Sequence, residues 1–518
     1  MQHLVERTAP VAGQSRNATA GAQPGAVSGT LCTGWWWWSC AAAIACLVLR
    51  LANILTLPVF TDESTWVRSG QFAALGPPHL FLELHYGAPP LFSWLEAPLM
   101  RLYPWTPILD GRIVAALVGT CTCILVMACA RQLGHGRLIP LAGWAYTLCP
   151  YAVFNNRMAM LDGTVAACTA LTLFFTLRLS RRPDKQDKPL NLLSLGLAIG
   201  AGLLTKFFAA ALLLLPMLLA ITARNRVVRL RLIVLPTMIG LTMLIPVLFA
   251  PGGQVLVAQI HQHSSLQHPA IAVARQFGAL GAWAVIYLTI PGCLLGLIGM
   301  MRAVKDGRSW HIVAVWPVLS ALVFTSIPAT FYASRYVFFL VVPAVLLIAL
   351  GADHVLRRVP RRPAAALLAL ALVPALVQDG LLVTNPAHAL LVPFDRWQYV
   401  EGWPAGYGFP ETVAWLKRAA RRGPVVVACS FANPPGDALH EELGGNPNVT
   451  IMLLDLGNAQ AGIAFTRVHP GAFIVTDEQA GSPALSAALR ARVREVARFW
   501  KPGHRAAYAI YQAPHPTT

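Results

Sequence analysis

The stretch CAAAIACLVLRLANILTLPVFTDESTW, residues 40–66, is an apolar run that stops at Pro58 and is followed at once by two adjacent carboxylates, Asp62 and Glu63. A run of this length crosses about 30 Å of hydrocarbon as a helix. Acidic side chains are scarce here, because only 22 of the 518 residues are Asp or Glu. The stretch therefore predicts a membrane helix that ends at a polar feature.

The rest of the chain repeats this pattern. Hydrophobic residues make up 56% of the sequence and charged residues 12%, and the mean hydropathy is +0.57. A soluble domain of this composition would expose large apolar patches to water. We predict spans at 35–57, 111–130, 138–154, 163–179, 190–205, 207–222, 232–250, 281–301, 311–328, 336–351 and 363–383. The expected fold is an all-α polytopic membrane protein with about eleven transmembrane helices and a small C-terminal α/β domain.

Much of the positive charge behind the net charge of +18 lies in the loops between these spans. If the N-terminus is cytoplasmic, every second loop is cytoplasmic, and those loops hold the dense Lys and Arg groups. These groups are Arg131 and Arg137; Arg178, Arg181, Arg182, Lys185 and Lys188; Arg224, Arg226, Arg229 and Arg231; Arg302, Lys305 and Arg308; and Arg357, Arg358, Arg361 and Arg362. The positive-inside rule then predicts a multi-pass protein of the plasma (inner) membrane with a cytoplasmic N-terminus, and the charge needs no nucleic-acid partner.

Two flanking segments differ from the spans. Residues 1–34 are rich in Gly, Ala, Ser and Thr and predict a disordered cytoplasmic tail. Residues 394–518 predict a soluble extracytoplasmic domain. Its expected strands are VVVACS (425–430), TIMLLDL (450–456), AFIVTD (472–477) and AYAIYQ (507–512), and its expected helices are ETVAWLKRAA (411–420) and ALRARVREVARFW (488–500).

Polar groups recur on the outer side of the predicted membrane domain, residues 35–390. Asp62 and Glu63 open a long outer loop, 59–110, and the other predicted outer turns carry Arg157 with Asp162, Lys206, and Arg335 with Tyr336. Charges at membrane helix ends usually face a cavity or the interface, although single Lys and Arg residues also anchor to headgroups and single Asp residues cap helices. A carboxylate beside two cations suits a site that deprotonates a hydroxyl and stabilises a phosphate leaving group.

Five motifs in consistent order resemble the GT-C glycosyltransferases that include the protein O-mannosyltransferases (family 39) and the aminoarabinose transferases (family 83). They are TDES (61–64), HYGAPPLFSWLEAPL (85–99), RMAMLDG (157–163), LLTKFFAAALLLLP (203–216) and SRYVFFLVVP (334–343), and EGWPAGYG (401–408) resembles a segment of bacterial family 39 relatives. Ala88 stands where the aminoarabinose transferases commonly have Lys, which disfavours lipid A modification, and Phe207 stands where Gly is usual in the Thr-Lys turn.

The resemblance implies inverting transfer of a sugar from a polyprenyl-phosphate donor to a protein, glycolipid or glycan hydroxyl beside the lipid bilayer. It makes Asp62 the catalytic base with Glu63 assisting, and Asp162, Arg157, Lys206, Arg335, Tyr336, His85 and Tyr86 the substrate-binding candidates. It implies no cofactor and no metal; a metal site at His261, His263 and His268 is disfavoured because no carboxylate supports it.

Three other classes compete with this interpretation. A transporter or flippase of lipid-linked sugars would need polar groups near the bilayer midplane. A scaffold protein would not need the Asp62–Glu63 pair. An oligosaccharyltransferase would carry a WWDYG-like segment in its soluble domain, which this sequence lacks.

Overall fold

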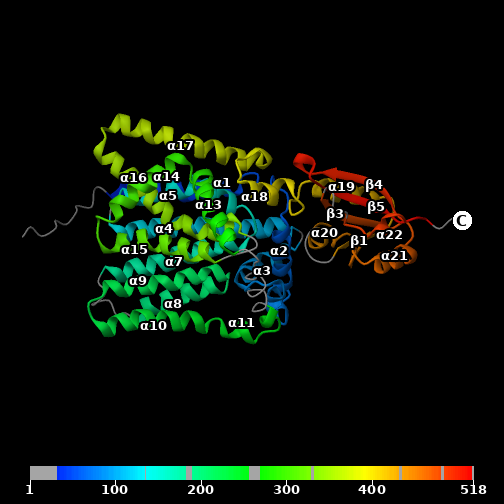
Figure 1. The fold of residues 1–518 in the computed structure, drawn as a ribbon, viewed down its shortest axis with the longest axis horizontal. Coiled ribbons are helices and arrows are strands. Elements are labelled where there is room, and N and C mark those ends of the chain that lie inside the picture. The colour runs from blue at the N-terminus through cyan, green and yellow to red at the C-terminus, as the bar shows by residue number, and fades with distance from the viewer. Residues whose placement is uncertain are drawn as a thin grey trace, which may run out of the picture.

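The computed structural model describes residues 32–104, 106–134, 136–181, 189–255, 269–327, 332–430, 435–479 and 484–515. The predicted tail lies outside the described residues apart from its last three, and so do His261, His263 and His268. A bundle of long helices fills one end of the molecule and a small sheet domain fills the other (Figure 1). We call the end of the bundle nearest the sheet the domain end, and the opposite one the basic end.

The bundle is built from apolar helices, as the hydropathy of the sequence predicts. Within the described ranges, eight helices are long and apolar enough to cross a membrane, and three shorter apolar helices accompany them at 189–203, 207–222 and 290–303. The elements are α1 (Cys32–Leu51), α4 (Pro107–Leu133), α5 (Leu138–Thr147), α6 (Pro150–Asn155), α7 (Leu161–Ser180), α8 (Pro189–Leu203), η2 (Phe207–Leu213), α9 (Leu214–Thr222), α10 (Arg226–Thr242), α11 (Ile245–Phe249), α13 (Pro269–Tyr287), α14 (Ile290–Ala303), α15 (Arg308–Ser326), η3 (Ser334–Leu340), α16 (Val341–Arg358) and α17 (Arg361–Thr384).

Two predicted spans are broken. The span expected at 281–301 is divided between α13 and α14, because the hydroxyl of Thr289 caps α14 and Pro291 in its first turn has no N–H to continue the preceding helix. The span expected at 138–154 breaks between α5 and α6, and α6 begins at Pro150. Both breaks follow the preference of Pro for the first turn of a helix.

The predicted outer loop is helical. It forms α2 (Thr61–Ala74), η1 (His79–Tyr86) and α3 (Leu91–Leu102), which lie at the domain end between the bundle and the sheet (Figure 1). Asp62 and Glu63 fall in the first turn of α2, where negative side chains interact favourably with the positive end of the helix dipole.

The C-terminal domain has a five-stranded mixed sheet with strand order β2-β1-β3-β5-β4. Strand β1 (Val425–Ser430) pairs in parallel with β2 (Val449–Leu454) and β3 (Phe473–Gln479), and β5 (Ala506–Gln512) pairs antiparallel with β3 and β4 (Arg494–Trp500). The helices are α19 (Phe409–Ala420), α20 (Gly436–Leu443), α21 (Ala459–Val468) and α22 (Ala487–Arg490), with a short turn η6 (Pro502–His504). Before α19 come η4 (Pro386–His388), α18 (Pro393–Arg396) and the π-helical turn η5 (Trp397–Glu401).

The helix predicted at 488–500 is wrong. Only its first residues are helical, in α22, and the rest is the edge strand β4. Val496, Phe499 and Trp500 favour a strand, and pairing with β5 allows Arg498 to bond Glu478 of β3. These long-range contacts outweigh the helical pattern of the segment.

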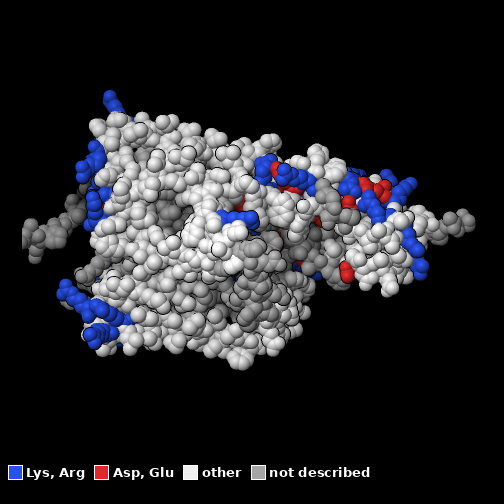
Figure 2. Space-filling view, in the orientation of Figure 1, with Lys and Arg blue, Asp and Glu red and all other residues white. Residues whose placement is uncertain are grey.

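The sheet domain shares a hydrophobic core with the outer loop. Val67 of α2 and Phe92 of α3 belong to the same buried cluster as Leu416 of α19 and Val427 of β1. The domain is therefore packed onto the loop. In Figure 2, Lys and Arg gather at the basic end and again on the sheet domain, and the sides of the bundle between them are largely uncharged.

Candidate active site

Two ion pairs gather four of the predicted site residues at the domain end. Arg335 Nη2 lies 2.5 Å from Asp62 Oδ2, and Lys206 Nζ lies 2.7 Å from Asp162 Oδ1. The four residues come from α2, α7, the turn before η2, and η3. Segments as far apart in sequence as residues 62 and 335 thus meet at the ends of helices.

Tyr336 joins the two ion pairs. The Lys206 ammonium lies 4.6 Å from the centre of its ring, and the Arg335 guanidinium carbon lies 5.5 Å from it. The Asp162 carboxylate is also near enough to Arg335 for a charge interaction. The five residues therefore form one cluster, which we call the acid–base cluster: Asp62, Asp162, Lys206, Arg335 and Tyr336.

Exposure within the acid–base cluster is uneven. The side chain of Asp62 is 36% exposed and that of Lys206 is 17% exposed, whereas Arg335 and Asp162 are 5% and 3% exposed. Asp62 and Lys206 are therefore the members that a reactant meets first, and Arg335 and Asp162 lie deeper in the cluster. Charges in such a partly dry setting interact more strongly than they do in water.

Glu63 has a different environment from its neighbour Asp62. Its carboxylate is fully buried and accepts two bonds from Arg112, Nε to Oε1 at 2.7 Å and Nη2 to Oε2 at 2.6 Å. It also accepts the backbone N–H groups of Ala159 and Phe60. Arg112 in turn donates to the carbonyls of Ile54 and Leu57. Glu63, with Arg112, thus connects the start of α2 to α4, to the segment after α1 and to the segment before α7.

The remaining predicted residues lie outside the acid–base cluster. The Arg157 guanidinium donates to four backbone carbonyls at the C-terminal end of α1, those of Leu49, Arg50, Ala52 and Asn53. His85 and Tyr86 end η1, where His85 is exposed. Tyr86 is half-buried, and burial raises the pKa of its hydroxyl, with Asp437 of the sheet domain adding to the rise. Tyr86 thus lies near the sheet domain, whereas the His85 ring lies beside Gly252, which follows α11.

Sequence reasoning missed Arg112 and Tyr399. The Tyr399 hydroxyl accepts a bond from Arg335 Nη1 at 3.3 Å, and its ring lies 4.6 Å from that of Phe60. Arg112 had a usable signal, because a charge one turn inside an apolar helix needs a partner. Tyr399 had none, since it lies at the start of the predicted soluble domain, far in sequence from the outer turns that carry the other charges.

Two buried carboxyls lie behind α2. Burial raises the pKa of Glu83 to about 8 and holds the pKa of Glu96 well above its ordinary value. The Glu96 carboxyl occupies the space left by two glycines, since a Cβ at Gly70 or Gly111 would lie 2.6 Å from one of its oxygens. Burial thus favours the protonated form of both carboxyls, which pack the loop. Within the described residues, no group of three or more His, Cys, Asp or Glu side chains is arranged to hold a metal.

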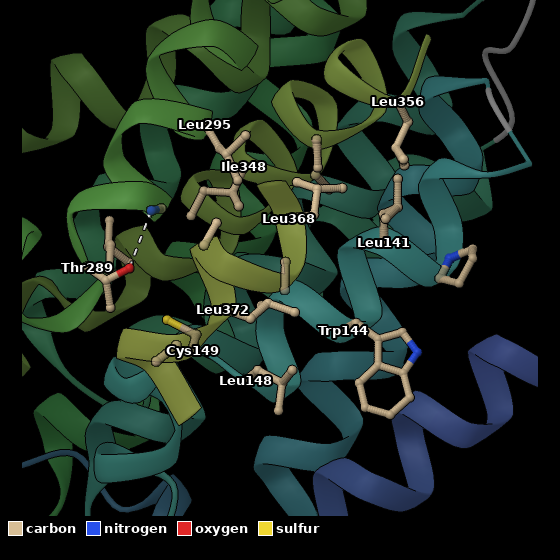
Figure 3. A pocket seen from close by; sticks show the side chains of 18 of the residues that line it. Leu141, Trp144, Leu148, Cys149, Thr289, Leu295, Ile348, Leu356, Leu368 and Leu372 are labelled. Carbon is tan, nitrogen blue, oxygen red and sulfur yellow. Dashed lines mark hydrogen bonds between the residues drawn. The ribbon is translucent and has the colours of Figure 1, made fainter. Parts of the chain in front are cut away.

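Two apolar cavities lie in the bundle. The first, about 480 Å³, is lined by α1, α5, α14, α16 and α17, including Trp144, Leu148 and Leu372 (Figure 3). The second, about 280 Å³, is lined in part by Val337, Leu340 and Val341, which follow Arg335 directly in η3 and α16. Walls of this kind accept hydrocarbon chains and not sugars.

Comparison with known proteins gives this arrangement a family context. Residues 87–249 match the model of the dolichyl-phosphate-mannose-protein mannosyltransferase family. ArnT from Cupriavidus metallidurans, in the apo state, has a TM-score of 0.58 at 14% identity over 93% of this chain and 98% of its own. The protein has the GT-C fold.

Two further structures share the GT-C fold. ArnT bound to undecaprenyl phosphate has a TM-score of 0.57 at 14% identity, again over 93% of this chain and 98% of its own. The Archaeoglobus fulgidus oligosaccharyltransferase, in complex with Zn and sulfate, has a TM-score of 0.54 at 11% identity over 91% of this chain and 73% of its own. No curated protein matches the chain by sequence. The resemblance to the GT-C glycosyltransferases, stated above from five motifs, is confirmed, and so is the multi-pass membrane fold.

Proposed function

We propose that this protein is a membrane glycosyltransferase that transfers a hexose from a polyprenyl-phosphate donor to an acceptor hydroxyl, on the outer side of the membrane. The acceptor is a protein Ser or Thr, a glycolipid or a cell-wall glycan. The observation that carries the proposal is the acid–base cluster, in which one half-exposed carboxylate and two cations meet at a single helix-end junction.

Lys206 and Arg335 are assigned to the donor phosphate. Arginine and lysine are the usual phosphate ligands of proteins, and the ion pairs with Asp162 and Asp62 hold both side chains in place. The lining of the second apolar cavity includes Val337, two residues after Arg335 in η3, and this cavity suits the isoprenoid tail. The ArnT structure with undecaprenyl phosphate supports this class of ligand.

Asp62 is assigned as the general base. The acceptor hydroxyl gives its proton to Asp62 while its oxygen bonds to the anomeric carbon, on the face opposite the phosphate. The bond between that carbon and the phosphate oxygen breaks, and its electron pair stays on the lipid phosphate. The configuration at the anomeric carbon is therefore inverted. Lys206 and Arg335 stabilise the negative charge that the leaving phosphate gains.

The other candidates take supporting roles. Glu63 and Arg157 position the helix ends of the site through their buried contacts. Asp162 orients Lys206. His85 and Tyr86 are assigned to the acceptor side, because both end η1 in the outer loop and Tyr86 lies near Asp437 of the sheet domain.

The orientation follows from charge. With Lys and Arg gathered at the basic end (Figure 2), that end and the N-terminus face the cytoplasm by the positive-inside rule. The acid–base cluster and the sheet domain then lie on the extracytoplasmic side of the inner membrane, where a polyprenyl-linked donor meets an aqueous acceptor.

The test is transfer by purified protein from a panel of radiolabelled polyprenyl-phosphate sugars to membrane and protein acceptors. Wild type is compared with Asp62→Asn and with Asp306→Asn, a control at the basic end whose carboxylate pairs with Arg302. Transfer by wild type and Asp306→Asn but not by Asp62→Asn supports the proposal. Full transfer by Asp62→Asn removes the base assignment. Movement of lipid-linked sugar across proteoliposomes without transfer, retained in Asp62→Asn, favours a flippase.

A further inference from the structure

Residues 393–408 connect the last bundle helix to the sheet domain and pass over the acid–base cluster. We call them the strap; they comprise α18, η5 and the turn EGWPAGYG up to Gly408. Figure 1 shows α18 between the end of α17 and the sheet. The sequence places nearly all of the strap in the predicted soluble domain, 394–518, yet its contacts reach the bundle and α2.

The strap contacts Arg335 directly. Tyr399 is 2% exposed, and its hydroxyl accepts from Arg335 Nη1 at 3.3 Å. Its ring packs on Phe60, which precedes α2, at 4.6 Å between ring centres. Asp395 of the strap is fully buried and accepts from the Tyr287 hydroxyl at 2.5 Å. The strap is therefore bonded both to the bundle and to the cation that pairs with Asp62.

The strap also caps the helix that carries Asp62. The Pro404 carbonyl accepts from the backbone N–H of Thr61 at 3.1 Å and from its hydroxyl at 2.9 Å. Phe60, at the N-cap position, offers no polar side chain for this purpose. The contact is close, because a Cβ at Gly406 would lie 2.0 Å from the Val59 carbonyl oxygen.

A lysine of the sheet domain anchors the strap. Lys501 is 1% exposed, and its ammonium donates to the Trp403 carbonyl at 2.8 Å and to both oxygens of Asp477 at 2.9 and 2.7 Å. Trp403 directly precedes Pro404. Hydrogen bonds therefore connect β3 to Lys501, Lys501 to Trp403, and Pro404 to Thr61. Because Trp403 and Pro404 are adjacent, as are Thr61 and Asp62, the connection from β3 to Asp62 is continuous.

We propose that the strap is a positioning element of the acid–base cluster, through which the sheet domain sets the geometry of Asp62 and Arg335. Thr61, Tyr399 and Lys501 are its positioning residues, and none of them is assigned to contact substrate. The inference rests on the proposed function for its catalytic meaning. Its structural content, that the sheet domain holds Asp62 through the strap, is independent of the reaction.

The kinetic test removes one bond at a time. Thr61→Val keeps the branched shape and deletes only the hydroxyl, so kcat should fall by between about 10-fold and 100-fold, as small displacements of reacting groups do. The donor KM should change by less than about twofold, and Thr61→Ser should restore kcat. Thr176→Val is the control, because that buried hydroxyl bonds only the Thr172 carbonyl within α7. Lys501→Met combined with Asp477→Asn, which leaves no unpaired buried charge, should lower kcat in the same way.

The second test does not need activity. The carboxylate of Asp62 is coupled to an amine with a carbodiimide, and the rate is read by peptide mass spectrometry. Releasing the strap by Thr61→Val, or by Lys501→Met with Asp477→Asn, should raise the rate at Asp62 severalfold, with Thr176→Val at the wild-type rate. Unchanged labelling in both variants overturns the inference, whatever the kinetics. Changed labelling in a protein without transferase activity refutes the proposed function and leaves the strap as the element that holds Asp62.

Discussion

Loss of charge at the two adjacent acids of α2 should change the stability of the protein by different amounts. Glu63→Gln leaves the Arg112 guanidinium buried, at 1% exposure, without its partner. Removing one member of a buried pair costs about 3–5 kcal/mol. Asp62 is 36% exposed, and its buried partner Arg335 keeps the Tyr399 hydroxyl and the nearby Asp162 carboxylate when Asp62 loses its charge. Glu63→Gln should therefore destabilise the protein, and Asp62→Asn should leave its stability within about 1 kcal/mol of wild type.

The size of the expected shift in melting temperature follows from the length of the chain. At about 2.1 cal/mol/K of unfolding entropy per residue, a chain of 518 residues loses about 1 °C per kcal/mol if it unfolds as one unit. Glu63→Gln should lower the apparent melting temperature in detergent by about 3–5 °C. Asp306→Asn, which breaks an exposed pair of 2.9 Å, is the matched control and should shift it by less than about 1 °C.

A double-mutant cycle isolates the pair. Glu63→Gln, Arg112→Met and the double variant should give a coupling of at least about 2 kcal/mol, since each single change leaves a buried group unpaired. The double variant should stay below wild type, because Arg112 also holds the carbonyls of Ile54 and Leu57. A Glu63→Gln protein that melts like wild type but loses transfer would refute the structural assignment of Glu63.

Three further outcomes are expected. Because the pKa of Glu83 is raised to about 8, the folded state keeps a proton that the unfolded chain loses above about pH 4.5, so this group's contribution to stability falls as pH rises from about 4.5 to 8. Glu83→Gln should melt like wild type at pH 5 and higher than wild type at pH 8.5, and parallel melting curves would contradict the buried neutral acid. Lys206→Met combined with Asp162→Asn should raise the donor KM at least about tenfold with the melting temperature nearly unchanged, and an unchanged KM would remove Lys206 from the phosphate site. Arg157→Met should lower the melting temperature, since four carbonyls at the end of α1 lose their donor, while the donor KM of the folded fraction stays at the wild-type value; a selective rise in that KM would place Arg157 at the substrate.

Much of the bundle was predictable from hydropathy. Helices α4, α7 and α17 overlap their predicted spans because a helix that faces lipid must be continuously apolar. The division of α13 from α14 was not, because the apolar run continues through the break. Only a cap at Thr289 and the proline at 291 mark it.

The acid–base cluster was predictable for a different reason. Charges are costly in membrane helices, so the few that remain at helix ends on one side, such as Asp62, Lys206 and Arg335, are candidates to meet. Their partners within the fold were not predictable. The Glu63–Arg112 pair joins residues 49 positions apart in sequence, and the bond from Thr61 to Pro404 joins residues 343 positions apart. No local sequence pattern predicts which residues so far apart will meet. The same limit explains β4, whose strand form depends on pairing with β5.

The proposed function gives the residues of one cluster separate roles: Asp62 takes a proton, and Lys206 and Arg335 bind the donor phosphate. The most direct measurement is binding of undecaprenyl phosphate to the protein in nanodiscs, with transfer measured on the same samples. Asp62→Asn should bind undecaprenyl phosphate at least as tightly as wild type, because Arg335 no longer shares its charge with a carboxylate, while its transfer rate falls at least about 100-fold. Arg335→Met should lose binding. If Asp62→Asn loses binding and transfer together, or keeps full transfer, these separate roles are contradicted.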